Sequence, residues 1–352
     1  MAKDSTVIDP QDAALSAGLT YVTDDMPGIT RRRAGKGFSY RDAEGRTIAD
    51  AAERRRLAAL AVPPAYDDVW ICPDPRGHIQ ATGRDAKGRK QYRYHPEFRA
   101  LRDSAKYEHM LEFARALPRI RNRVDRDMRR RGLPLDKVAA SIVYLLEHSM
   151  IRVGNDRYAK ENKSHGLTTL RARHVDLSGS QLRFRFKGKS NKEWDLRLTD
   201  RRIARVVRAL QDIPGQHLFQ YLDEDGTRQR VTSGEVNDYL RRVSGREVTA
   251  KDFRTWTGTV LAALALAECE KADSEAAAKR QLRDVIEEVA ARLGNTPTIC
   301  RQCYVHPQVI EAHLSGSLTL DLRARIDDDL KRQGLSAEER QVLRFLRRRL
   351  KA

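Results

Sequence analysis

Residues 182–198 read LRFRFKGKSNKEWDLRL and have the pattern of a clear β-insert. In both halves apolar side chains alternate with charged ones, which is the period of a half-buried strand. Between the halves, residues 187–192 (KGKSNK) have the glycine and polar content of a hairpin tip. The spacing therefore predicts a β-hairpin, inserted into a region that otherwise has helical periodicity.

Helical spacing is found on both sides of this hairpin. Val138, Ile142 and Leu145 fall on one face of residues 136–150, which predicts a buried helix. We expect further helices at 200–210, 233–243, 253–266 and 274–293, and a final basic helix after Ser336. Gly294 follows the last apolar residue of the fourth of these and is typical of a helix stop.

Residues before Pro96 show a different pattern, with short alternating segments between Gly, Pro and Asp turns. We expect a hairpin at 31–40, a helix at 50–60, and strands at 68–72, 78–82 and 90–94. Residues 1–20 are polar, and we expect them to fray. The chain is thus predicted to be α+β, with a small antiparallel β-sheet domain at 1–99. A larger, mainly helical domain with a hairpin or three-stranded insert is expected at 100–352.

The charge balance indicates a polyanionic partner. Lys and Arg number 67 against 49 Asp and Glu, a net charge of +18. Basic clusters lie at 31–33, 54–56, 84–93, 119–131, 187–192 and 344–351. Such a wide distribution favours a protein that surrounds duplex DNA over one with a single basic arm. The longest apolar run, 260–267, is far below the ~20 residues that span a bilayer. With no secretory signal and only four cysteines, we expect an intracellular protein without membrane contact.

Five residues with suitable chemistry lie at predicted element boundaries: Arg152, Lys189, Arg254, Asn295 and Tyr304. A phosphodiester under attack develops negative charge on its oxygens, which the planar forks of two arginines can stabilise. A tyrosine with the ordinary pKa of ~10 needs cationic surroundings to act as a nucleophile. A lysine on a hairpin tip can supply the proton that a leaving hydroxyl requires. This set needs no cofactor and no metal, and the sequence contains no phosphate-binding glycine loop and no zinc spacing.

In its motifs, this set resembles that of the type IB DNA topoisomerases, in particular the small bacterial enzymes related to the poxvirus topoisomerase. Arg152 stands in the Ile-Arg-x-Gly context of that family, and Lys189 ends its Phe-x-Gly-Lys hairpin motif. Arg254 stands in its Lys-Asp-Phe-Arg-Thr context. The resemblance covers nearly the whole chain, from about 32 to 320.

The last two members of the set follow the same family order. Asn295 comes directly after the helix-ending glycine, and Tyr304 follows it by nine residues, as the nucleophile does in the family. Asn295 departs from the viral pattern, which has His there; an amide donates hydrogen bonds but carries no positive charge. The resemblance also assigns phosphate-binding roles to Tyr158 and Lys251.

The same resemblance implies a function. It implies relaxation of supercoiled double-stranded DNA by transient cleavage of one strand through a 3′-phosphotyrosyl intermediate. Strand swivelling and religation follow, without ATP or metal. It also implies a C-shaped clamp around the duplex, acting as a monomer in the cytoplasm at the nucleoid.

One N-terminal strand and its turn are candidates for DNA contact: Lys87, Arg89, Gln91, Tyr92 and Tyr94. They resemble the family's strand that enters the major groove. Glutamine pairs with adenine edges, and tyrosine contacts thymine methyl groups or phosphates. Alternation places Tyr92 and Tyr94 on one face and Gln91 on the other. The sequence leaves open which face meets DNA and which meets the core.

Two alternatives belong to other classes of protein. A tyrosine recombinase shares the fold and the nucleophile, but it usually has His-x-x-Arg where this chain has Lys251 and Arg254. Recombinases also carry a helical N-terminal domain, whereas this N-terminus has a strand pattern. A non-catalytic DNA-binding protein has no need of Tyr304. Both arguments favour the topoisomerase.

Overall fold

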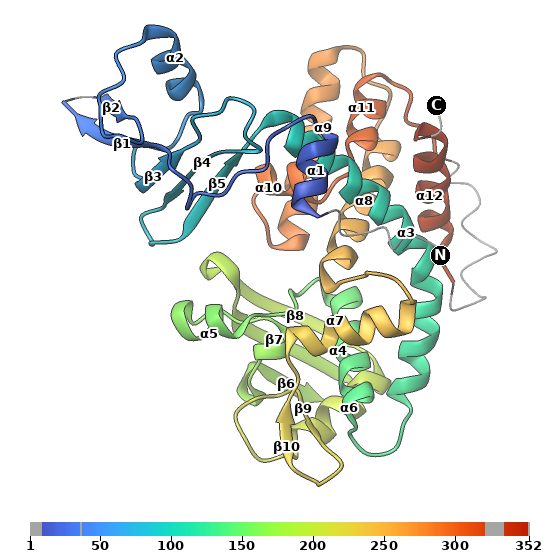
Figure 1. Cartoon of the computed structure of the whole chain (residues 1–352). Helices are drawn as coiled ribbons and strands as arrows, with labels where there is room; N and C mark the ends of the chain where they lie inside the picture. The colour runs from blue at the N-terminus through green and yellow to red at the C-terminus, as the bar shows by residue number, and fades with distance from the viewer. Residues whose placement is uncertain (1–8, 36, 321–333, 351–352) are drawn as a thin grey trace, which may run out of the picture. The chain divides into compact units, whose positions relative to one another are not determined.

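A computed structural model describes residues 9–35, 37–320 and 334–350. It consists of two compact units, Met1–His109 and Met110–Ala352, which are described one at a time (Figure 1). The boundary between them falls within the 33-residue helix α3 (Pro96–Met128).

The N-terminal unit contains a five-stranded antiparallel sheet, as the sequence predicts. Its strand order is β2-β1-β3-β4-β5. The strands are β1 (Ile29–Ala34), β2 (Gly37–Arg41), β3 (Asp67–Ile71), β4 (Ile79–Arg84) and β5 (Lys90–Tyr94). Helix α2 (Ala51–Ala59) buries Leu57 against Ile29 and Ile71 of the sheet. The side chain of Asp50 accepts a hydrogen bond from the Glu53 N–H at 2.7 Å and caps this helix.

The expectation that residues 1–20 fray is wrong for the described part of that segment; residues 1–8 lie outside it. Helix α1 (Pro10–Ser16) starts with a proline, and the Asp9 carboxylate accepts a hydrogen bond from the Gln11 N–H. Ala13, Ala14 and Leu19 are buried with Phe98. Three small or apolar residues spaced along a polar sequence are therefore enough to hold this segment on the unit.

The second unit is mainly helical and contains two small sheets. Besides the C-terminal part of α3, its helices are α4 (Leu135–Ser149), α5 (Asp156–Asn162), α6 (Arg201–Gln211), α7 (Ser233–Ser244), α8 (Ala250–Glu268), α9 (Glu275–Leu293), α10 (Pro297–Cys303), α11 (Pro307–Leu314) and α12 (Ala337–Arg349). Short 3₁₀ turns are η1 (Leu167–Thr169), η2 (Ala172–His174) and η3 (Lys189–Asn191). In the described part of the chain, no helix combines the length and apolar composition needed to cross a membrane.

The predicted hairpin is present and forms part of a three-stranded antiparallel sheet, in the order β6-β7-β8. The strands are β6 (Val175–Ser178), β7 (Gln181–Lys187) and β8 (Glu193–Thr199). Phe186 pairs with Trp194 and Phe184 with Leu196, and Leu182 and Phe184 are fully buried. The alternation read from the sequence therefore describes the real faces of this sheet. A second, two-stranded sheet of β9 (Gln220–Leu222) and β10 (Arg228–Arg230) was not predicted.

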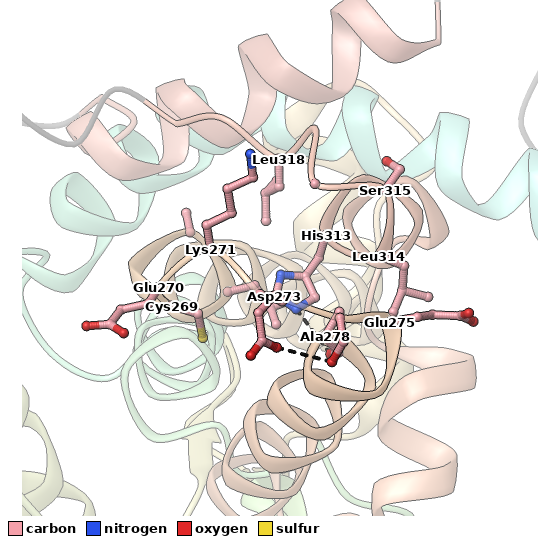
Figure 2. A pocket seen from close by; sticks show the side chains of 15 residues that line it. Cys269, Glu270, Lys271, Asp273, Glu275, Ala278, His313, Leu314, Ser315 and Leu318 are labelled. Carbon is pink, nitrogen blue, oxygen red and sulfur yellow. Dashed lines mark hydrogen bonds between the residues drawn. The ribbon is translucent and has the colours of Figure 1, made fainter.

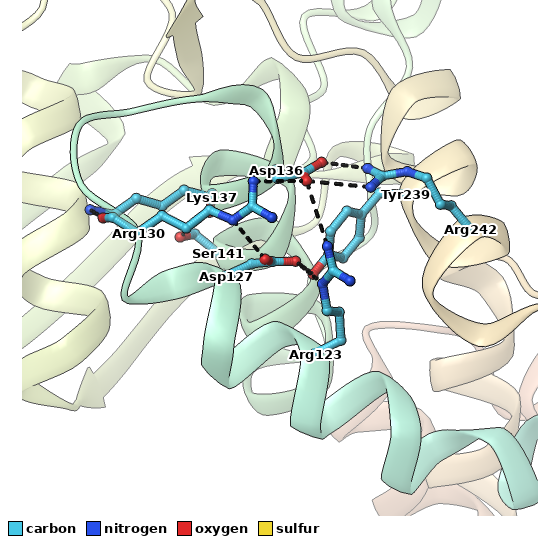
Figure 3. A network of polar contacts seen from close by, with 8 residues as sticks. All are labelled: Arg123, Asp127, Arg130, Asp136, Lys137, Ser141, Tyr239 and Arg242. Atoms are coloured by element: carbon cyan, nitrogen blue, oxygen red, sulfur yellow. Dashed lines mark hydrogen bonds and ion pairs between the residues drawn. The ribbon is translucent and has the colours of Figure 1, made fainter.

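A polar network holds α4, which leads to the candidate site, against α3 and α7 (Figure 3). The fully buried carboxylate of Asp127 contacts Arg123 at 2.7 Å and Arg130 at 2.8 Å, and accepts a hydrogen bond from the Tyr239 hydroxyl at 2.9 Å. Asp136 in the first turn of α4 binds Arg242 of α7. Because each carboxylate has several donors, the network fixes the start of α4 relative to both helices.

Candidate active site

Arg254 is a buried cation held by the ends of two helices. It lies in the second turn of α8 and is 3% exposed. It donates one hydrogen bond to the carbonyl of Met150, the left-handed residue that ends α4, and another at 2.5 Å to the carbonyl of Leu293 in α9. Carbonyls at helix C-termini carry partial negative charge, so α4 and α9 both orient and stabilise this guanidinium.

Arg152 follows Met150 by two residues and contacts the end of α9. It donates hydrogen bonds to the carbonyl of Gly294 at 3.2 Å and to the side-chain oxygen of Asn295. Gly294 ends α9 with φ of 63°, a left-handed conformation that suits glycine. The predicted helix stop is thus confirmed, and the turn it makes brings Asn295 to Arg152.

Tyr304 lies directly after α10, as the capping residue of that helix. The guanidinium carbon of Arg254 is 5.3 Å from the centroid of its ring. Burial lowers the pKa of Arg152, and burial together with Arg152 lowers the pKa of Arg254 to about 10, while interaction with Tyr304 opposes both shifts. Arg254 therefore remains charged at neutral pH, and two cations flank the phenol.

Two donors of this group lack a hydrogen-bond partner within the described residues: the side-chain nitrogen of Asn295 and Nε of Arg254. Both atoms are buried. Unsatisfied buried donors are rare in folded proteins and costly, so they call for a functional explanation. An anion bound beside Tyr304 would satisfy them.

For Lys189, the structure shows that its hairpin lies near this region, but among the described residues it shows no contact of the Lys189 side chain with the other site residues. It begins the turn η3 between β7 and β8, and its side chain is exposed. On the same hairpin, the Lys192 amine donates to the carbonyl of Ala291 at 3.4 Å, and a Cβ on Gly294 would lie 2.7 Å from the Trp194 ring. The hairpin thus packs on the end of α9, whereas contact of the Lys189 amine with the other four residues stays a prediction.

Two residues of α8 that the sequence did not single out form a seat for Tyr304. A Cβ on Gly258 would lie 2.8 Å from the main-chain oxygen of Tyr304. The fully buried Thr259 hydroxyl donates to that oxygen at 3.2 Å and accepts from the His306 N–H at 3.1 Å. A glycine inside a buried helix was the available signal, since it usually marks a close approach.

The structure describes the two residues with predicted phosphate-binding roles to different extents. Lys251 lies in the first turn of α8, one turn before Arg254, and is exposed. Tyr158 belongs to α5, and its side chain lies outside the described part of the structure. The role of both residues in phosphate binding remains a prediction.

The candidate DNA-contacting strand lies in the N-terminal unit. Tyr94 packs against Phe98, while Tyr92 is 44% exposed and stacks on Tyr94 with ring centroids 5.9 Å apart. Gln91 donates to Asp85 at 3.0 Å. In the preceding turn Lys87 is exposed, and Arg89 forms an ion pair with Asp85 at 2.6 Å. Tyr94 therefore belongs partly to the core of the N-terminal unit. Tyr92 lies on the same face of the strand and is more exposed.

Two family models match the two parts of the chain. Residues 95–319 match the model described as the catalytic core of eukaryotic DNA topoisomerase I, and residues 37–85 match that of the N-terminal domain of bacterial DNA topoisomerase IB. The first match covers more than half of the chain. The chain therefore belongs to the type IB DNA topoisomerases and is an enzyme that acts on DNA topology.

Individual relatives agree with this family. The chain is 30% identical to DNA topoisomerase 1B of Acanthamoeba polyphaga mimivirus over 295 residues, 82% of this chain and 88% of that protein. It is 22% identical to DNA topoisomerase 1B of Vaccinia virus (strain Copenhagen), over 70% of this chain and 75% of that protein. DNA topoisomerase 1 of Rabbit fibroma virus (strain Kasza) is 24% identical, over 65% of this chain and 70% of its own length.

Proposed function

We propose that this enzyme relaxes supercoiled duplex DNA by cutting one strand, letting it swivel and resealing it, through a covalent link between Tyr304 and a DNA 3′-phosphate. The observation that carries the proposal is the meeting of Arg152, Arg254, Asn295 and Tyr304 at the ends of α4, α9 and α10. Two buried donors there lack partners within the described residues and suit the oxygens of a phosphodiester.

In the cleavage step the phenol oxygen of Tyr304 bonds to phosphorus, and the bond from phosphorus to the 5′ oxygen breaks. The phenolic proton leaves to solvent. The two guanidiniums stabilise the charge that develops on the non-bridging oxygens, and the Asn295 amide donates to one of them. Because neutral Asn replaces a cationic His at this position, its contribution does not depend on protonation.

The departing 5′ oxygen takes a proton from Lys189, which acts as the general acid. The hairpin packs on the end of α9 through Trp194, and in this proposal its tip presents the Lys189 amine to the scissile bond. Resealing reverses the steps: Lys189 accepts the proton of the 5′ hydroxyl, and the tyrosine leaves. The phosphotyrosyl link preserves the bond energy, so ATP is not required, and the fixed side-chain cations act without a metal.

The grip on DNA involves both units in this proposal. The N-terminal unit contacts the duplex through Lys87, Arg89, Gln91, Tyr92 and Tyr94. The catalytic unit adds Tyr158 and Lys251 at flanking phosphates. The two units close around the duplex as a C-shaped clamp, and the protein acts as a monomer at the nucleoid in the cytoplasm.

The test is a plasmid assay with purified protein, supercoiled DNA and EDTA, without ATP. We expect a ladder of relaxed topoisomers, and none with Tyr304→Phe, which should still bind DNA. Binding without relaxation by the wild-type protein would favour a non-catalytic DNA-binding protein. Joining of two DNA molecules without relaxation would favour a recombinase.

A further inference from the structure

The second unit contains a basic cavity that the proposed reaction does not use. It has a volume of about 610 Å³, opens to solvent, and is lined by α5, the turns η1 and η2, the end of β7 and strand β10. Its walls include none of the five predicted catalytic residues. A cavity of this size holds a small ligand rather than one or two waters.

The charge of its walls is strongly unbalanced. Six cationic side chains line the cavity: Lys160, Lys163, Arg171, Arg173, Lys187 and Arg230. The single carboxylate is that of Asp156, and it is already bound to Arg230. No carboxylate of the described residues lies within 4.0 Å of the other five cations. Gathering unpaired like charges is unfavourable unless an anion joins them.

The adjoining sheet and a second cavity do not share this imbalance. On the adjoining sheet Arg183 pairs with Asp195 at 2.5 Å, and Arg185 pairs with Asp176 at 2.6 Å. A second cavity of about 510 Å³ lies between the end of α8, the start of α9 and the end of α11 (Figure 2). Its charged lining is the reverse, with one lysine against three carboxylates, namely Lys271, Glu270, Asp273 and Glu275.

Neutral donors and acceptors complete the basic cavity. His165, His174 and His217 line it, and burial is the main cause that lowers the pKa of each, that of His174 to about 4. They are therefore uncharged at neutral pH and serve as hydrogen-bonding groups. Nδ1 of His217 and Nε of Arg230 are buried without a hydrogen-bond partner within the described residues. A ligand with several oxygens could satisfy both.

The walls are held in place by the main chain. The His165 N–H donates to the carbonyl of Lys187 at 2.8 Å, and Arg171 pairs with His217 as an isolated β-bridge. The ion pair of Asp156 and Arg230 ties α5 to β10. The main chain that carries these cations is thus held in place, which lowers the ordering cost of binding an anion.

We propose that this cavity is a second anion site of the enzyme and that it binds phosphate groups. Arginine forks and lysine ammonium groups are the side chains that recognise phosphate oxygens, and the neutral histidines add further hydrogen bonds. The phosphate can come from a free polyphosphate anion or from the backbone of bound DNA. Lys187 belongs to the cavity wall and lies two residues before Lys189, so an occupied site stabilises the base of the catalytic hairpin.

The test is calorimetric titration of the whole protein with inorganic tripolyphosphate at low salt. We expect the wild-type protein to bind tripolyphosphate, and the binding event that belongs to this cavity to be about tenfold weaker in the double variant Lys160→Gln/Arg173→Gln. Both side chains are exposed and come from different walls, so the variant should fold. The control is Lys279→Gln/Arg283→Gln on α9, which removes the same charge from two exposed side chains. Equal losses in both variants, or no binding by the wild-type protein, would overturn the proposal.

A second experiment distinguishes the two sources. If a phosphate of bound DNA occupies the cavity, tripolyphosphate should compete with a short duplex. The double variant should then show a shallower salt dependence of DNA affinity, by about one unit of slope per lost contact. If the ligand is a free anion, the slope should stay as in the wild type and tripolyphosphate should bind the DNA complex. Neither readout requires relaxation activity, so failure here leaves the proposed reaction standing.

Discussion

Gly258 and Tyr304 approach each other more closely than any residue with a side chain would allow. A Cβ on Gly258 would lie 2.8 Å from the Tyr304 main-chain oxygen and 3.2 Å from its Cβ. Glycine inside a helix costs about 1 kcal/mol relative to alanine. The close contact between α8 and the segment that carries the phenol explains why the helix has glycine here.

Gly258→Ala should therefore impair cleavage without preventing DNA binding. The added methyl group meets backbone rather than a flexible side chain, so Tyr304 must shift. A displacement of about 1 Å at a reacting group costs about 10²-fold in rate. The measurement is the single-turnover cleavage rate beside DNA affinity. Gly234→Ala is the control, since a Cβ there meets only the Thr232 hydroxyl at 3.6 Å. If Gly258→Ala cleaved DNA at the wild-type rate, the claim that Gly258 positions Tyr304 would be wrong.

Lys189→Ala should slow cleavage of ordinary DNA by about 10²-fold to 10⁴-fold, the usual contribution of a general acid. On a substrate whose scissile 5′ oxygen is replaced by sulfur, the defect should largely disappear, because a thiolate leaves without a proton. Lys192→Ala on the same hairpin serves as the control and should affect both substrates alike. A Lys189→Ala defect of equal size on both substrates would remove the residue from the acid role.

Tyr92 and Tyr94 should separate into a DNA contact and a core residue. Tyr92→Ala is expected to weaken duplex binding about tenfold while changing the unfolding free energy by less than about 0.5 kcal/mol, because the residue is 44% exposed. Tyr94→Ala should lower that free energy by about 2 kcal/mol, because its half-buried ring packs on Phe98. Duplex titrations and urea unfolding measure the two effects. If Tyr94→Ala weakened duplex binding and Tyr92→Ala lowered the unfolding free energy instead, Tyr94 and not Tyr92 would be the DNA contact.

Asp136→Asn should lower stability at neutral pH, and the difference from the wild type should shrink in acid. The hydrogen bond from Arg242 holds the pKa of Asp136 below its usual value. Such a carboxylate stabilises the fold above its unfolded pKa of ~3.9, and this contribution is lost as the pH falls from there through the folded pKa. Urea unfolding at pH 7 and pH 3 measures it.

The matched control for this network is Asp238→Asn in α7. Its carboxylate is 67% exposed and pairs with Arg241 in the same helix, so the effect should stay within about 1 kcal/mol. If the unfolding free energies of Asp136→Asn and the wild type differed by the same amount at pH 7 and pH 3, the charge of Asp136 would not be the cause of the difference.

Most elements of this fold could be predicted from local patterns. The alternation in 182–198 describes the faces of β7 and β8, and Gly294 ends α9 where a left-handed residue is needed. Asn295 and Tyr304 could be singled out because they stand at fixed offsets from that stop. Motif order supplied Arg152 and Arg254, although periodicity alone does not show that they meet.

The remaining features depend on contacts between distant segments. The seat formed by Gly258 and Thr259 exists because α8 passes beside the residue after α10. A glycine inside a helix signals a close approach but does not tell which distant segment makes it. The basic cavity joins residues from 156 to 230, which are scattered along the sequence. Helix α1 was missed because its few buried residues lie in a polar segment and are held by Phe98.

The central claim is that Tyr304 is the nucleophile, and trapping the covalent intermediate tests it most directly. A nicked suicide duplex, which cannot be resealed, would be incubated with the protein in EDTA and the reaction stopped with detergent. Mass spectrometry of the digested adduct should find DNA attached through its 3′-phosphate to Tyr304, and Tyr304→Phe should give no adduct. Attachment at another residue, attachment through a 5′-phosphate, or an adduct formed by Tyr304→Phe would contradict the account.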